Sequence, residues 1–179
     1  VQSSAWRLNN GTWQNGTPQI DGEGEIVLDI RAADNAGNTR IRRYTFTLDQ
    51  TPPVGAITLT GEAGVEDWYR SAVEVNLTGE DAVSGVAEVR LPQAVIEAEG
   101  WHVVRGEVED KAGWVTEIRR SFGIDLTPPQ GGFDALPELL SGTVELAGDA
   151  SDALSGLLRL EISFSMGYQW QEITATNDR

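Results

Sequence analysis

Six aspartates stand at recurring places in this chain, each in a turn or at the end of a segment that alternates like a strand. Carboxylates that converge near one point are the ligands that a hard cation such as Ca²⁺ prefers. An Asp before a turn also commonly accepts hydrogen bonds from the backbone amides of that turn, so both roles stay open. None of the six lies in a loop with the ligand spacing of a dedicated calcium motif. The candidate calcium ligands are Asp34, Asp49, Asp81, Asp110, Asp125 and Asp152.

The residues needed for nucleophilic or acid–base catalysis are scarce. His102 is the single histidine and lies in a segment that alternates like a strand, so a Ser-His-Asp triad would have to be built on it. The carboxylates of Glu97 and Glu99 are two positions apart and share a strand face, but no feature gives the two acids different roles. The single lysine, Lys111, stands in a turn. The sequence therefore predicts that the chain is not an enzyme.

Six tryptophans could supply aromatic faces for recognition. Exposed aromatic rings stack on sugar rings or on partner proteins. Trp6 and Trp13 lie near the turn-rich beginning of the sequence, where exposure is expected, and they are the candidate ligand-binding residues. Packing in a core or at a module junction accounts for Trp68, Trp101 and Trp114.

Composition restricts the partners of the chain. A formal net charge of −15 opposes binding to phosphate backbones, so nucleic acid is not an expected partner. The sequence has no cysteine, and disulfides therefore cannot stabilise it. No apolar run approaches the roughly 20 residues that a membrane-spanning helix needs, so no membrane-spanning segment is expected within this sequence.

The elements that must position these residues are repeated. Fixed self-similarity at a period of tens of residues indicates an array of small modules. Two motifs return at one shared offset, which we call one repeat, and a third returns at a slightly shorter offset. The first two pairs are Asp34–Asn38 with Asp110–Trp114 and Thr51–Pro53 with Thr127–Pro129, and the third is Asp81–Gly85 with Asp152–Gly156.

The segments between these motifs alternate apolar and polar residues. Ile26, Leu28 and Ile30 share one strand face, and the alternation resumes after Asp34–Asn38 with Phe46 and Leu48, which predicts a hairpin. The same hairpin is expected over 101–109 and 115–124, and further strands over 73–77, 86–91, 144–146 and 157–164. No stretch keeps a helical period, so the predicted class is all-β, with small antiparallel β-sandwiches joined by stiff Thr-Pro-Pro linkers.

The order of the elements predicts three domains. Residues 51–126 contain every element once, whereas residues 1–50 hold only the later strands of a module and residues 127–179 only the earlier ones. Two explanations stay open. Either the chain is part of a longer array, or the strands of one copy complete the module of another, which would build a filament.

Several motifs carry a resemblance to a known family. Trp68–Thr78, followed by Asp81 and Ser84–Val86, resembles the opening half of immunoglobulin-like modules in bacterial secreted and cell-surface proteins. Arg31–Asn38, followed by Phe46, Asp49 and Thr51–Pro53, resembles their closing half. The chain departs from the family pattern in two places. Trp114 replaces the Asn expected after Gly113, and Leu139-Leu140 stand where a third module should have Trp-Tyr.

The resemblance implies an immunoglobulin-like fold and an extracellular or cell-surface location in bacteria. It also implies a structural role as a stalk, spacer or filament component, in contact with neighbouring modules or with other copies of the chain. The alternative function is an adhesive module that binds carbohydrate or cell-surface protein through exposed Trp. Ca²⁺ is the one candidate cofactor, and an immunoglobulin-like fold alone identifies no ligand.

Overall fold

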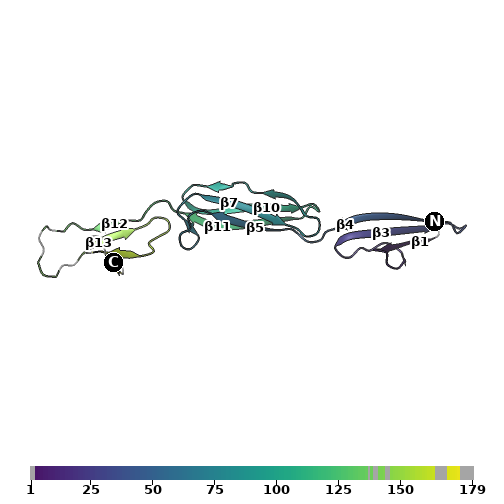
Figure 1. Cartoon of the computed structure of the whole chain (residues 1–179), viewed down its shortest axis with the longest axis horizontal. Coiled ribbons are helices and arrows are strands. Elements are labelled where there is room, and N and C mark those ends of the chain that lie inside the picture. The colour runs from purple at the N-terminus through teal and green to yellow at the C-terminus, as the bar shows by residue number, and fades with distance from the viewer. Residues whose placement is uncertain (1–2, 137, 139–140, 144–145, 164–168, 174–179) are drawn as a thin grey trace. The chain divides into compact units, whose positions relative to one another are not determined.

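A computed structural model of the chain describes residues 3–136, 138, 141–143, 146–163 and 169–173. The described part contains fifteen strands and no helix, so the predicted all-β class is confirmed (Figure 1). Within that part, no helix could cross a membrane. The predictions for Leu139-Leu140, for Val144 and for Phe164 lie outside the described residues.

The first sheet lies near the N-terminus. It has four strands in the order β2-β1-β3-β4. The β3–β4 hairpin pairs continuously from Gly24 opposite Leu48 to Ala33 opposite Thr39, as the alternation predicts. Gly37 closes the turn with a φ of 87°, a conformation that favours glycine. The strands are β1 (Ser3–Leu8), β2 (Gln14–Asn15), β3 (Gly24–Ala33) and β4 (Thr39–Leu48).

The middle of the chain forms two further sheets. One has three strands in the order β5-β7-β9, and the other has four in the order β6-β11-β10-β8. β8 pairs with β10 and β7 pairs with β9 in the antiparallel direction, whereas the short β6 runs parallel to β11. The strands are β5 (Val54–Thr60), β6 (Trp68–Tyr69), β7 (Val73–Glu80), β8 (Val86–Arg90), β9 (Val95–Ile96), β10 (Gly100–Asp110) and β11 (Val115–Ile124).

Side chains of the two middle sheets meet in a sandwich-like core. Val108 of β10 packs so closely against Gly79 of β7 that a Cβ there would overlap its side chain, and Leu77 of β7 packs against Gly106 of β10 in the same way. Small residues opposite large ones let the sheets approach each other. The buried apolar residues of these strands are Val73, Val75, Leu77, Ile96, Val104, Val108, Phe122 and Ile124.

The described residues after position 129 form two short antiparallel ladders. β12 (Gln130–Phe133) pairs with β13 (Gly148–Ser151), and β14 (Leu160–Ile162) pairs with β15 (Gln171–Ile173). β12 follows the second Thr-Pro-Pro segment directly, as β5 follows the first, which agrees with the repeat.

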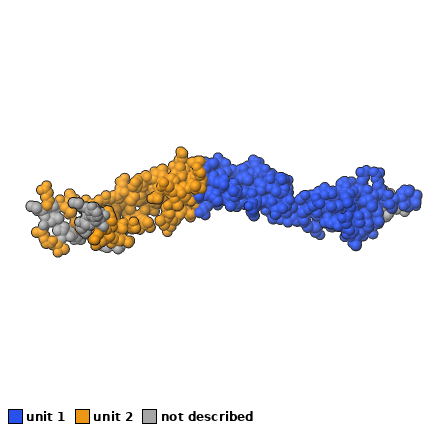
Figure 2. All heavy atoms as spheres, in the orientation of Figure 1, with its two compact units in different colours: residues 1–59, 75–94, 104–120 blue, residues 60–74, 95–103, 121–179 orange. Residues whose placement is uncertain are grey.

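The chain divides into two compact units, which Figure 2 shows in different colours. The first unit comprises residues 1–59, 75–94 and 104–120, and the second comprises residues 60–74, 95–103 and 121–179. The domain boundaries at residues 50/51 and 126/127 remain predictions from the sequence.

Candidate functional site

The first Thr-Pro-Pro segment (Asp49–Pro53) follows β4 in the first unit. Asp49 is buried, with 8% of its surface exposed. Its Oδ1 accepts a hydrogen bond from the Thr51 amide at 3.1 Å, and its Oδ2 accepts one from the Ser84 amide at 3.0 Å. The contact with Ser84 is the main reason that the pKa of Asp49 is lowered. Asp49 therefore ties the end of a strand to a loop that lies far along the chain.

The second Thr-Pro-Pro segment (Asp125–Pro129) repeats this arrangement in the second unit. Asp125 accepts the Thr127 amide at 3.1 Å and the Ser155 amide at 3.0 Å. Hydrogen bonding to Ser155 lowers the pKa of Asp125, as Ser84 does for Asp49. The same side-chain chemistry therefore recurs one repeat further along the chain.

A glutamate that directly precedes a strand supports each Thr-Pro-Pro segment. Glu23 Oε1 accepts the Gln50 amide at 3.1 Å and the Thr51 hydroxyl at 2.5 Å. Glu99 Oε1 accepts the Leu126 amide at 2.7 Å and the Thr127 hydroxyl at 2.8 Å. Glu23 and Glu99 also stand one repeat apart, and the motif comparison of the sequence missed this pair.

Asp81 and Asp152 hold the loops that meet these segments. Asp81 Oδ1 accepts the amides of Val83 and Gly85 at 3.1 and 2.6 Å. Asp152 Oδ1 makes the corresponding bonds with Leu154 and Gly156 at 3.1 and 2.7 Å. Each loop ends on a glycine with a φ of 78°. Both aspartates therefore fold their own loops, which is the turn role left open from the sequence.

The two Asp-x-Ala-Gly turns differ in one contact. In the first, Asp34 Oδ1 accepts the amides of Ala36 and Asn38, and Oδ2 accepts the side-chain amide of Asn38 at 2.9 Å. These bonds to Asn38 lower the pKa of Asp34. In the second, Asp110 Oδ1 accepts the amides of Ala112 and Trp114 at 2.8 and 2.9 Å. Asp110 Oδ2 is buried and has no hydrogen-bond partner among the described residues.

Three of the six candidate ligands come together in the first unit. One carboxylate oxygen each from Asp49, Asp81 and Asp110 lies within 4.8 Å of the others. Of the remaining three, Asp125 and Asp152 both contact Ser155, and Asp34 hydrogen bonds within its own turn. The six candidate aspartates could be named from the sequence, but the fold determines which of their carboxylates lie close together.

The two tryptophans predicted to bind a ligand are not freely exposed. Trp6 is buried, with 7% of its surface exposed, so the expectation of exposure was wrong for this ring. Trp13 is half-buried, and the guanidinium groups of Arg7 and Arg31 lie 4.8 and 4.4 Å from the centre of its ring. Such cation–π contacts cover the ring with the chain's own cations.

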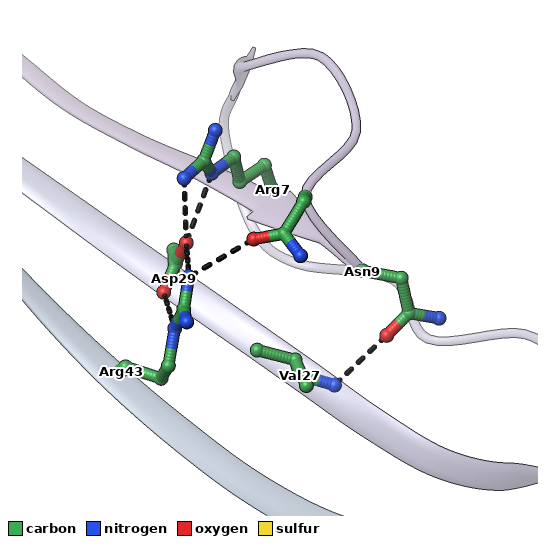
Figure 3. A network of polar contacts seen from close by, with 6 residues as sticks. Arg7, Asn9, Val27, Asp29 and Arg43 are labelled. Atoms are coloured by element: carbon green, nitrogen blue, oxygen red, sulfur yellow. Dashed lines mark hydrogen bonds and ion pairs between the residues drawn. The ribbon is translucent and has the colours of Figure 1, made fainter.

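The first sheet holds a charge network around a buried aspartate, which the sequence did not reveal (Figure 3). Asp29 is 1% exposed and lies directly opposite Arg7 on one side and Arg43 on the other. Both arginines hydrogen bond to its carboxylate at 2.7–2.9 Å. Chiefly through Arg43, they lower the pKa of Asp29 to about 2. The position one repeat further on is Arg105, so this network belongs to the first sheet and not to the repeat.

The single histidine packs against an aromatic ring. The His102 ring lies 5.7 Å from that of Phe122, and its Nε2 is 2.7 Å from the Ala98 carbonyl oxygen. These contacts give His102 a packing role in the second unit.

Family models, curated proteins and solved structures were all compared with the chain, and none matched.

Proposed function

We propose that the chain is a structural segment of a bacterial extracellular or cell-surface protein, where tandem immunoglobulin-like modules act as a stalk, spacer or filament component. One observation carries the proposal. The contacts of the first Thr-Pro-Pro segment recur at the second, with the same residue types and nearly the same distances. A repeated set of Thr-Pro-Pro joints suits a protein that holds other parts at a fixed distance, because each added repeat lengthens the array by a similar amount.

The contacts of each Thr-Pro-Pro segment, which we call a joint, limit its conformational freedom. Two consecutive prolines fix φ and remove backbone donors, which favours an extended chain. In the first segment, the Asp49 side chain holds the Ser84 amide, while the Trp114 indole donates to the Asp49 carbonyl oxygen at 3.1 Å. The linker is therefore attached through its side chain and through its backbone. A joint held in this way keeps its direction under load better than a flexible linker of the same length.

Distance measurements between spin labels would test the stiffness of the first joint. The chain has no cysteine, so Thr45→Cys and Ala87→Cys would provide two unique labelling sites on exposed positions of the first unit. We expect a narrow distance distribution that broadens in Asp49→Ala and stays narrow in the control Asp21→Ala, an exposed acid outside the segment. A broad distribution in the unmodified joint, or no broadening in Asp49→Ala, would contradict a spacer function.

Other copies of the chain are the proposed partners in a filament. Phe46 occupies the repeat position of Phe122, but 36% of Phe46 is exposed and none of Phe122. Tyr44 on the same strand is 52% exposed. In the middle of the chain, a second sheet that contains β5 and β7 contributes to the core. Residues 127–179 begin with β12, the counterpart of β5, and so could supply such a sheet. We infer that residues 127–179 of a second copy cover the apolar side chains of the first sheet.

Recognition of carbohydrate or protein is the second candidate function. Trp101 is 57% exposed and packs edge-on against Trp68, with ring centres 5.6 Å apart. Trp68, Tyr69 and Arg70 line a hollow beside the second Thr-Pro-Pro segment. Aromatic rings beside a guanidinium suit sugar binding. A saturable change in Trp fluorescence with polysaccharide, lost in Trp101→Ala, would favour recognition, and no change would leave the structural function.

A further inference from the structure

We propose that Asp49, Asp81 and Asp110 bind one divalent cation, with Ca²⁺ as the best match, and that the cation locks the first Thr-Pro-Pro segment to two turns. The three carboxylates come from different parts of the chain. Asp49 follows β4, Asp81 follows β7, and Asp110 ends β10. One cation bound by all three would therefore join elements that are distant in sequence. Cation binding goes beyond the proposed spacer function. It can be measured directly, and it would hold even if the chain were not a spacer.

The buried oxygen of Asp110 is the observation that points to a ligand. Asp110 is 1% exposed, and its Oδ2 lacks a hydrogen-bond partner among the described residues. Buried polar atoms are almost always hydrogen bonded, and a buried carboxylate oxygen without a partner is strongly destabilising. A cation beside this oxygen would remove that penalty.

The repeat shows why this oxygen lacks a partner. In the first turn, the side chain of Asn38 donates to Asp34 Oδ2. In the second turn, Trp114 occupies the position of Asn38, and its indole donates instead to the Asp49 carbonyl oxygen. The replacement leaves Asp110 Oδ2 without the amide donor that Asn38 supplies in the first turn. The departure from the family pattern therefore coincides with the acidic cluster.

The upper limit on the spacing of the cluster is compatible with calcium. The three oxygens lie within 4.8 Å of one another. Ca²⁺ binds oxygen at about 2.3–2.6 Å, so two ligands on opposite sides of one ion are at most about 5 Å apart. Mg²⁺ binds at about 2.0–2.1 Å, which limits the same separation to about 4.2 Å. Ca²⁺ can therefore bridge a pair of oxygens at this limit, whereas Mg²⁺ would need a tighter cluster, and water or backbone carbonyls would complete the calcium shell.

A second group of acids provides an internal comparison. Asp125 and Asp152 sit at the second Thr-Pro-Pro segment, and both contact Ser155 as Asp49 and Asp81 contact Ser84. No third carboxylate joins them in the part of the chain that the structure describes. Among the described residues, we therefore expect the strong site at the first segment.

Calorimetric titration of the metal-free full chain tests the assignment. CaCl₂ and MgCl₂ would be titrated in about 150 mM KCl, which screens nonspecific attraction to the acidic surface. We expect one Ca²⁺ per chain with a Kd at or below about 1 mM, and weaker binding of Mg²⁺. Asp110→Asn should weaken Ca²⁺ binding at least about tenfold, because it removes one ligand charge. Asp152→Asn should leave the affinity unchanged.

Two further measurements keep the test decisive if a variant is damaged. Asp110→Asn retains an oxygen for the amides of Ala112 and Trp114, and Asp81→Asn offers an independent loss of ligand charge. The melting temperature of the unmodified chain should rise with Ca²⁺ and fall with chelator. The proposal would be overturned if the titration released or absorbed no heat and Ca²⁺ did not shift the melting temperature. Unchanged affinity in Asp110→Asn, or a loss in Asp152→Asn instead, would also overturn it.

Discussion

Truncation of Phe122 tests the core of the middle segment. The side chain is fully buried, with the Tyr69 ring packed edge-on at 5.8 Å and the His102 ring at 5.7 Å. Phe→Ala at a buried site typically destabilises by about 3–5 kcal/mol, from lost transfer free energy and the cavity left behind. Aromatic contacts on two sides place Phe122→Ala in the upper part of that range.

The expected loss of stability is large relative to the free energy of unfolding of the whole segment. A segment the length of one repeat has an unfolding free energy of about 4–11 kcal/mol. Urea denaturation followed by circular dichroism would measure the change. The midpoint should fall by about 3–4 M at an unchanged slope of about 1.3 kcal/mol/M, provided that the variant still folds. Phe122→Leu keeps most of the volume and should lose less than about 1.5 kcal/mol, so it remains measurable if Phe122→Ala is unfolded.

Phe46→Ala is the matched control, because it makes the same chemical change at the same repeat position. With 36% of its surface already exposed, Phe46 should lose less than about 2 kcal/mol. Equal losses at the two positions would contradict the greater burial of Phe122. A loss below about 1 kcal/mol in Phe122→Ala would refute the assigned core.

Two further predictions concern the first sheet. Since the pKa of Asp29 is lowered to about 2 in the folded chain, its ion pairs stabilise the sheet above about pH 4, and this contribution is lost as the pH falls towards 2. Thermal melts across this range should show the loss, and Asp29→Asn should flatten it; an unchanged pH profile in the variant would argue against the network. If residues 127–179 of a second copy cover the first sheet, light scattering should show a mass that rises with concentration, whereas a monomer throughout would exclude that partner.

Much of the fold could be predicted from the sequence where the pattern is local. The hairpin of β3 and β4 follows from alternation and from a turn with glycine at the position that needs a positive φ. The hydrogen bonds of Asp81 to its own loop follow from the preference of Asp for turns. Such features depend on residues a few positions apart.

The remaining features depend on which strands are neighbours. Alternation along β3 does not show that Arg7 and Arg43 flank Asp29. Trp6, which is buried, likewise lies opposite Ile30 of β3, a neighbour that the local pattern does not show. Six aspartates could be named from the repeat, but only the packing of loops decides that Asp49, Asp81 and Asp110 meet.

The pairing register of the first sheet sets how it would resist a pulling force. Ser3 at the start of β1 pairs with Ala33 at one end of β3, and Leu48 at the end of β4 pairs with Gly24 at the other end. Tension applied at Ser3 and Leu48 therefore acts on opposite ends of β3, and it slides the strands along each other. All ten pairs between β3 and β4 share the load at once, instead of opening one after another from a free end. The sheet is thus built for shear, the loading direction in which backbone hydrogen bonds must fail together.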